Sequence, residues 1–217
     1  MTKRILIAIT ISLFILSCAN DKNEEKVTDK IAISIDSTLV TDSSWGAITG
    51  KTDIQGLREI FGEANVVDER ICGLECTDSI DVTKIYKETN KEFIIYWADS
   101  FYHKSINMIE CYAEGAPYHT ATGLKMGRSM QDILTENGKP INFLGFGWDY
   151  GGNIISYNKG KLDSSNIKFR LDLPGEVENQ TLFGDTELST TNPDFKEYFD
   201  KMLINRIYLF FNEQPYQ

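Results

Sequence analysis

The chain has 217 residues, of which 41% are hydrophobic, 12% aromatic and 25% charged. This composition is that of an ordinary globular protein, and it excludes collagen, coiled coils and polytopic membrane proteins. The 22 basic and 32 acidic residues give a net charge of -10, which excludes the basic surface that nucleic-acid binding needs. With only two histidines, His103 and His119, the chain has little material for histidine-based catalysis or a histidine-rich metal site.

The start of the chain has the pattern of a secretory signal peptide. Two basic residues, Lys3 and Arg4, precede an apolar run at residues 5–16 that contains two hydroxyl residues and no charge. The run is too short to cross a bilayer, because a membrane-spanning helix needs about 20 apolar residues. We therefore expect a segment that directs export and is then removed.

The residues that end this run predict a lipid anchor. Ile15-Leu16-Ser17-Cys18 resembles the lipobox of bacterial lipoproteins, with Ile and Leu at two positions where Leu and a small residue are commoner. The resemblance implies that residues 1–17 are a signal peptide and that the Cys18 thiol carries a diacylglycerol. We expect the mature protein to be held in a membrane of the cell envelope, the outer membrane, on its periplasmic or surface face.

Residues 18–44 are predicted to form the lipidated end and a flexible tether. Both charges are mixed along this stretch, and no aromatic residue occurs between Phe14 and Trp45. Such a composition buries too little apolar surface to offset the entropy lost on ordering. Residues 45–217 are then predicted to form a single domain.

A helix signal occurs twice in this domain. Residues 50–62 and 127–138 each begin with Gly, a basic residue and a hydroxyl residue, continue with apolar residues at helical spacing, and end at Gly. Thr52 and Ser129 are suited to cap the two helices, because a side-chain oxygen can accept an N–H that the first turn leaves free. The repeat predicts two subrepeats, at about 45–115 and 116–217.

Apolar runs typical of strands follow each helix, at 82–86, 93–97 and 106–112, and at 141–146, 154–157 and 167–173. A third helix is predicted from Asn192-Pro193, and a last strand over 206–211. These elements predict an α+β fold, in which an antiparallel sheet and three short helices form a tandem helix–β-meander repeat.

Two resemblances accompany this pattern. The capped helix that ends in Gly-x-Pro before a meander is similar to the repeat unit of BamE-like and β-lactamase-inhibitor-like folds. The segment 145–152, GFGWDYGG, resembles a signature of uncharacterised lipoproteins of Bacteroidota. The resemblances imply a fold and an envelope location, and they imply no reaction.

The remaining cysteines are Cys72, Cys76 and Cys111. Because an exported protein meets an oxidising compartment, a disulfide is expected, and three pairings are open. We favour Cys72 with Cys76, which leaves Cys111 as a buried thiol. Three cysteines far from both histidines do not supply the four ligands of a zinc site, so we predict no metal and no cofactor.

The candidate binding residues are Trp148, Asp149 and Tyr150, in a predicted turn. Exposed rings beside a carboxylate would stack on a sugar or anchor a protein interface, whereas rings folded back would only pack on the sheet. No residue is marked as catalytic. We expect a non-enzymatic module that binds an envelope protein or glycan. The alternative is a hydrolase of glycan or peptidoglycan, which needs two carboxyl groups about 5–10 Å apart, one with a raised pKa.

Overall fold

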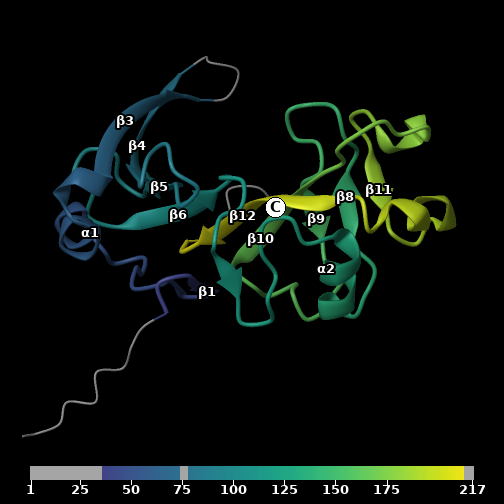
Figure 1. Ribbon diagram of the computed structural model, residues 1–217, viewed down its shortest axis with the longest axis horizontal. Helices are drawn as coiled ribbons and strands as arrows, with labels where there is room; N and C mark the ends of the chain where they lie inside the picture. Colours follow the sequence, from purple (N-terminus) through teal and green to yellow (C-terminus); the bar gives the residue numbers. More distant parts are fainter. Residues whose placement is uncertain (1–35, 74–77, 213–217) are drawn as a thin grey trace, which may run out of the picture. The chain divides into compact units, whose positions relative to one another are not determined.

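The structure, a computed structural model, describes residues 36–73 and 78–212 (Figure 1). Residues Ile35–Gln217 form one compact unit, and most of the buried apolar side chains in the described ranges form one continuous core cluster. Cys18, most of the predicted tether and Cys76 lie outside the described residues. Within the described ranges, no helix is long and apolar enough to cross a membrane.

A six-stranded antiparallel sheet organises the fold, with the strand order β10-β12-β6-β5-β4-β3. Its strands are β3 (Val66–Cys72), β4 (Ser79–Ile85), β5 (Phe93–Trp97), β6 (Ile106–Cys111), β10 (Ile167–Asp172) and β12 (Leu203–Phe210). The sequence pattern predicted five of these strands and missed β3, where three consecutive charges interrupt the apolar pattern. The prediction of an α+β fold with antiparallel sheet is confirmed.

Two smaller sheets complete the β structure. One has the order β11-β8-β9, and the other has the order β2-β1-β7, in which β1 pairs with β7 in parallel. Their strands are β8 (Asn142–Leu144), β9 (Ile154–Ser156), β11 (Glu187–Ser189), β1 (Leu39–Thr41), β2 (Ser44–Trp45) and β7 (His119–Thr120). Because β1 lies within 18–44, the last part of the predicted tether belongs to the folded body.

Two α-helices lie in the described part of the chain, α1 (Ile54–Phe61) and α2 (Met130–Asn137). Ser129 caps α2 as predicted, in a capping box where it also donates its backbone N–H to the Asp132 carboxylate. Helix α1 begins one residue later than predicted, because the cap is Asp53, whose carboxylate accepts the Gly56 N–H at 2.9 Å.

The predicted third helix is a 3₁₀ helix, η4 (Pro193–Tyr198), capped by Asn192 and begun by Pro193 as expected. Two shorter 3₁₀ helices are η1 (Glu63–Asn65) and η3 (Gln180–Leu182). The apolar residues of η4 enter the core, as the helical spacing predicted. The helix itself is shorter than predicted.

Two runs of elements begin with a helix and continue with four strands, and we call them the two copies of the repeat. One copy runs α1-β3-β4-β5-β6 and the other α2-β8-β9-β10-β12, with β11 inserted before β12. In the second copy β8 and β9 belong to a separate sheet, and Asn153, which precedes β9, forms a bridge with Arg170 of β10. The two copies meet where β6 pairs with β12 (Figure 1). Each has a register shift in its third strand, after Tyr96 in β5 and after Arg170 in β10.

The core occupies one face of the six-stranded sheet. Alternate residues of β5, including Phe93 and Ile95, meet Leu57 from α1, and Met130 and Ile133 from α2 join the same cluster. Such alternation is expected where an antiparallel sheet buries one face.

The opposite face carries a polar contact at the junction of the two copies. Glu110 of β6 is only 4% exposed; it accepts a hydrogen bond from the Tyr96 hydroxyl at 2.7 Å and forms an ion pair with Arg206 of β12. The contact joins three strands of the sheet across the boundary between the repeats.

Candidate functional site

The connection between β5 and β6 displays two aromatic rings to solvent. Phe101 is 84% exposed and Tyr102 is 67% exposed, the two highest values among the large exposed hydrophobic residues in the described part of the chain. Their rings lie edge to face with centroids 4.8 Å apart. We call residues 99–104 the aromatic loop.

The base of the aromatic loop is held by its own polar groups. The Asp99 carboxylate accepts backbone N–H groups from Tyr102 at 2.5 Å and from Lys104 at 3.3 Å. His103 adopts a left-handed backbone conformation with a φ of 48°, and its carbonyl accepts the N–H of Ile54, the first residue of α1. The loop is thus fixed both to itself and to the helix.

The ring of His103 is also anchored. It stacks on the Trp97 indole, with centroids 4.7 Å apart and an angle of 6° between the planes. The side chain of His103 is 16% exposed, and its Nε2 is buried and makes no hydrogen bond within the described residues. The stack therefore fixes the residue next to Phe101 and Tyr102 against the core.

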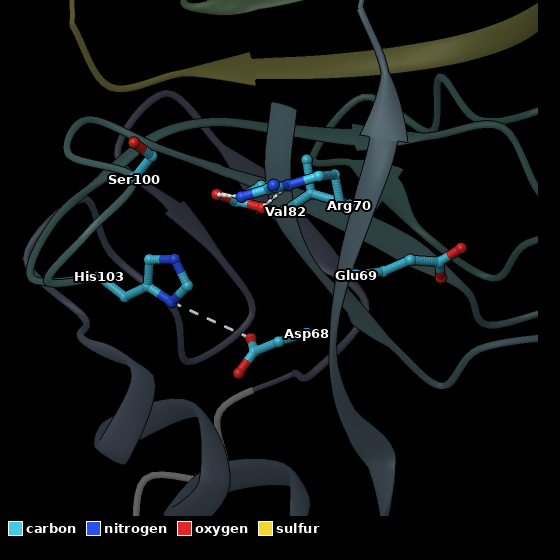
Figure 2. Close-up of a pocket in the computed structure, with 7 residues that line it drawn as sticks. Asp68, Glu69, Arg70, Val82, Ser100 and His103 are labelled. Atoms are coloured by element: carbon cyan, nitrogen blue, oxygen red, sulfur yellow. Dashed lines mark hydrogen bonds and ion pairs between the residues drawn. The ribbon is translucent and has the colours of Figure 1, made fainter. Parts of the chain in front are cut away.

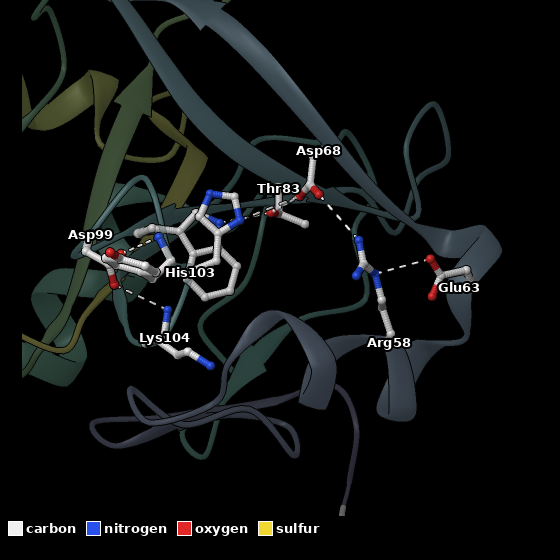
Figure 3. A network of polar contacts seen from close by, with 9 residues as sticks. Arg58, Glu63, Asp68, Thr83, Asp99, His103 and Lys104 are labelled. Carbon is white, nitrogen blue, oxygen red and sulfur yellow. Dashed lines mark hydrogen bonds and ion pairs between the residues drawn. The ribbon is translucent and has the colours of Figure 1, made fainter.

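A polar network centred on Asp68 connects the loop to the sheet (Figure 3). The buried Thr83 hydroxyl donates to the Asp68 carboxylate at 2.6 Å and accepts the Trp97 indole N–H at 2.9 Å. His103 Nδ1 lies 4.0 Å from the same carboxylate, and the Arg58 guanidinium reaches it from α1 at 3.5 Å. The network joins β3, β4, β5, α1 and the aromatic loop.

Between the aromatic loop and the β3–β4 hairpin lies an open pocket of about 260 Å³ (Figure 2). Its lining residues are Asp68, Glu69, Arg70, Asp81, Val82, Ser100 and His103. Arg70 makes two hydrogen bonds with Asp81, at 2.7 and 2.9 Å. The Glu69 carboxylate points away from His103 and pairs with Lys84 and Lys87.

Two carboxyl groups that line this pocket, Asp81 and Glu69, form ion pairs that favour their charged form. Hydrogen bonds from Arg70 lower the pKa of Asp81, and hydrogen bonds from Lys87 and then Lys84 lower the pKa of Glu69. A glycoside hydrolase needs the opposite arrangement, a carboxylic acid whose pKa is raised so that it can donate a proton. Asp81 and Glu69 do not have this arrangement.

The predicted binding residues lie elsewhere, in the loop between β8 and β9. The Trp148 indole is half-buried and donates its N–H to the Gly145 carbonyl at 2.8 Å, while Tyr150 is 40% exposed and Asp149 is exposed. The Trp148 and Tyr150 rings meet edge to face at 5.4 Å. The structure brings the two rings together but directs the indole N–H to the backbone.

The cysteines and the second histidine form no joint site in the described residues. Cys72, at the end of β3, is disulfide-bonded, and its predicted partner Cys76 lies outside the described residues. Cys111 is a free buried thiol that donates to the Glu92 carbonyl, and burial raises its pKa to about 11. His119 instead lies 3.6 Å from the Asp36 carboxylate. Within the described ranges, no three His, Cys, Asp or Glu side chains are placed to hold a metal ion.

Comparison with known proteins finds a solved structure with a similar fold. The crystal structure of the uncharacterized protein YfeY from Escherichia coli matches with a TM-score of 0.50 and 13% sequence identity, covering 80% of this chain and 99% of that chain. At this identity the likeness shows the fold alone. No family model matches the chain, and no curated protein matches its sequence.

Proposed function

We propose that this protein is a lipoprotein of the cell envelope, anchored through Cys18, that binds a partner protein through the aromatic loop and has no catalytic role. The observation that carries the proposal is the pair of solvent-facing rings, Phe101 and Tyr102, on a loop whose base is fixed. The anchor itself is supported by the lipobox-like residues that end at Cys18.

The energetics of protein recognition favour this loop over other exposed residues. Binding energy concentrates in a few aromatic anchors, and it is largest where the anchor needs little ordering when the complex forms. Asp99 and the stacked His103 already hold the backbone on either side of the rings, so a partner gains the apolar contact with little loss of entropy.

The loop suits a protein better than a glycan. Phe101 offers no hydrogen-bonding group, and the edge-to-face rings do not form a flat platform for a sugar. Trp148, Asp149 and Tyr150 are the better glycan candidate, because a carboxylate lies between two rings there. We place them second because Trp148 is half-buried and its indole N–H is already bonded.

Site-specific photo-crosslinking tests the proposal in intact cells that make the full chain. A photoreactive phenylalanine analogue at Phe101 should give a discrete protein adduct, and the same analogue at Ile155 is the control, because Ile155 is 47% exposed on β9. Tyr102→Ala should abolish the adduct. Equal labelling from both positions would refute the proposal. It would also be refuted if the chain sedimented with purified peptidoglycan and this sedimentation required Phe101.

A further inference from the structure

The strand β3 is an open edge of the six-stranded sheet. It has seven residues and pairs on one side with β4, and no other strand of the described chain pairs with it. An open edge is a row of N–H and C=O groups that a further strand can extend.

The register with β4 fixes which residues of β3 point outward. The Tyr86 N–H donates to the Asn65 carbonyl at 3.0 Å, and the Gly73 N–H donates to the Asp78 carbonyl at 2.9 Å. In an antiparallel pair, bonded and non-bonded residues alternate, so odd-numbered residues from 65 to 73 bond to β4. The backbone groups of Asp68 and Arg70 are therefore directed to the free edge.

We propose that β3 pairs in antiparallel fashion with β3 of a second copy of this chain, about a two-fold axis at Glu69. In this register Asp68 of one copy lies opposite Arg70 of the second copy, and their backbone groups form hydrogen bonds. The two-fold axis repeats this pair, with Arg70 of the first copy opposite Asp68 of the second. Both pairs join opposite charges. The inference rests on the strand edge and is independent of the proposed function of the aromatic loop.

The charges select this register over its neighbours. A shift by two residues in one direction places Asp68 opposite Asp68, and a shift in the other direction places Arg70 opposite Arg70. Like charges directly opposite each other destabilise a strand pair, and opposite charges stabilise it. The order acid, acid, base along 68–70 therefore favours one antiparallel register, whereas a row of like charges would prevent pairing.

The other face of β3 is compatible with the same register. Val67 comes to lie opposite Ile71, which is an apolar pair, and Glu69 lies opposite Glu69 at the axis. The like charges at the axis are offset because Lys84 and Lys87 hold the Glu69 carboxylate at 3.2 and 3.0 Å in each copy.

The side chains that would meet are accessible. The Asp68 side chain is 45% exposed and that of Arg70 is 68% exposed, so each can reach across the edge while keeping its contact within the chain. Because both line the pocket beside the aromatic loop, pairing would place two such pockets on the same side of one twelve-stranded sheet.

Cysteine cross-linking in membranes that carry the full chain tests the register. In the proposed dimer Glu69 is a non-bonded pair with itself, with about 4.5 Å between Cα atoms, which a disulfide can span. Glu69→Cys should therefore give a disulfide-linked dimer on a non-reducing gel. Val67→Cys and Ile71→Cys should each give none alone, and a mixture of the two chains should give the dimer.

A second arm tests the charges. Adding Arg70→Asp to the Glu69→Cys chain turns two attractive pairs into two repulsive ones and should reduce the dimer yield about tenfold or more. Co-expression with an Asp68→Arg, Glu69→Cys chain should restore it. Three outcomes overturn the proposal. Val67→Cys alone could cross-link as well as Glu69→Cys, or Glu69→Cys could give no dimer above the parent chain. The charge reversal, in a chain that is still folded, could also leave the yield unchanged.

Discussion

The imidazole of His103 lies parallel to the indole of Trp97, with the ring centroids 4.7 Å apart. The stack joins the aromatic loop to a buried network, since the Trp97 N–H bonds to Thr83, which in turn bonds to Asp68. The loop that carries the exposed rings is thus linked to a residue of the core.

Trp97→Phe should test this link. The variant keeps an aromatic ring in the core but loses the N–H bond to Thr83 and part of the stack on His103. We expect the free energy of unfolding to fall by about 1–2 kcal/mol. Chemical denaturation measures this loss, and limited proteolysis should show faster cleavage within residues 99–104. Phe101→Ala is the control, because loss of an exposed ring should change stability by less than about 0.5 kcal/mol.

Arg206→Met should destabilise the junction of the two repeats. The change leaves the buried Glu110 carboxylate without its ion-pair partner, which costs about 3 kcal/mol or more. Addition of Glu110→Gln should recover much of the loss, because the uncompensated charge is then removed. A double-mutant cycle of unfolding free energies measures the coupling, and additive losses would contradict it.

Acid should weaken the β3–β4 hairpin. The pKa of Asp81 is lowered from 3.8 by Arg70, and that of Glu69 is lowered from 4.5 by Lys87 and Lys84. A lowered pKa in the folded state contributes stability above the unfolded value, and this stability is lost as the pH falls through the folded value. Melting temperature should therefore fall between about pH 5 and pH 2. Asp81→Asn should melt lower at pH 7 and show a smaller further drop in acid, and an unchanged drop would refute the assignment.

Trp148→Ala distinguishes the two expectations for the loop between β8 and β9, rings that are exposed for binding and rings that pack on the sheet. Since the indole is half-buried and bonded to the Gly145 carbonyl, we expect a loss of about 1–3 kcal/mol, below the cost of emptying a core site. Tyr150→Ala, which removes a more exposed ring, should cost less. Equal and negligible losses would indicate that both rings are free for binding.

Cys18→Ala should release the protein from membranes, because the proposed lipid on Cys18 carries two acyl chains, which provide stable anchoring. Fractionation of cells with immunoblotting measures this. A variant that stays in the membrane fraction would show that lipidation is not the sole anchor.

The local signals in the sequence predicted the local structure well. Ser129 caps α2, Asn192-Pro193 begins η4, and alternating residues of β10 face the core, as expected from short-range physics. Helix α1 differed by one residue because Thr52 and Asp53 are both suitable caps, and the choice depends on contacts beyond the helix.

The non-local features escaped sequence reasoning. The strand β3 was not predicted because of its three consecutive charged residues. An edge strand with exposed side chains need not alternate apolar and polar residues. The aromatic loop escaped notice because a pair of adjacent rings in a polar segment does not show which way they face. The stack of His103 on Trp97 at the base of this loop joins residues that only the folded chain brings together.

The last strand of the described chain, β12, lies between β6 and β10 in the middle of the sheet. Residues 203–210 must therefore leave the ribosome before the first meander finds its neighbour. Until β12 arrives, β6 and β10 have no strand between them, and the six-stranded sheet stays in two parts.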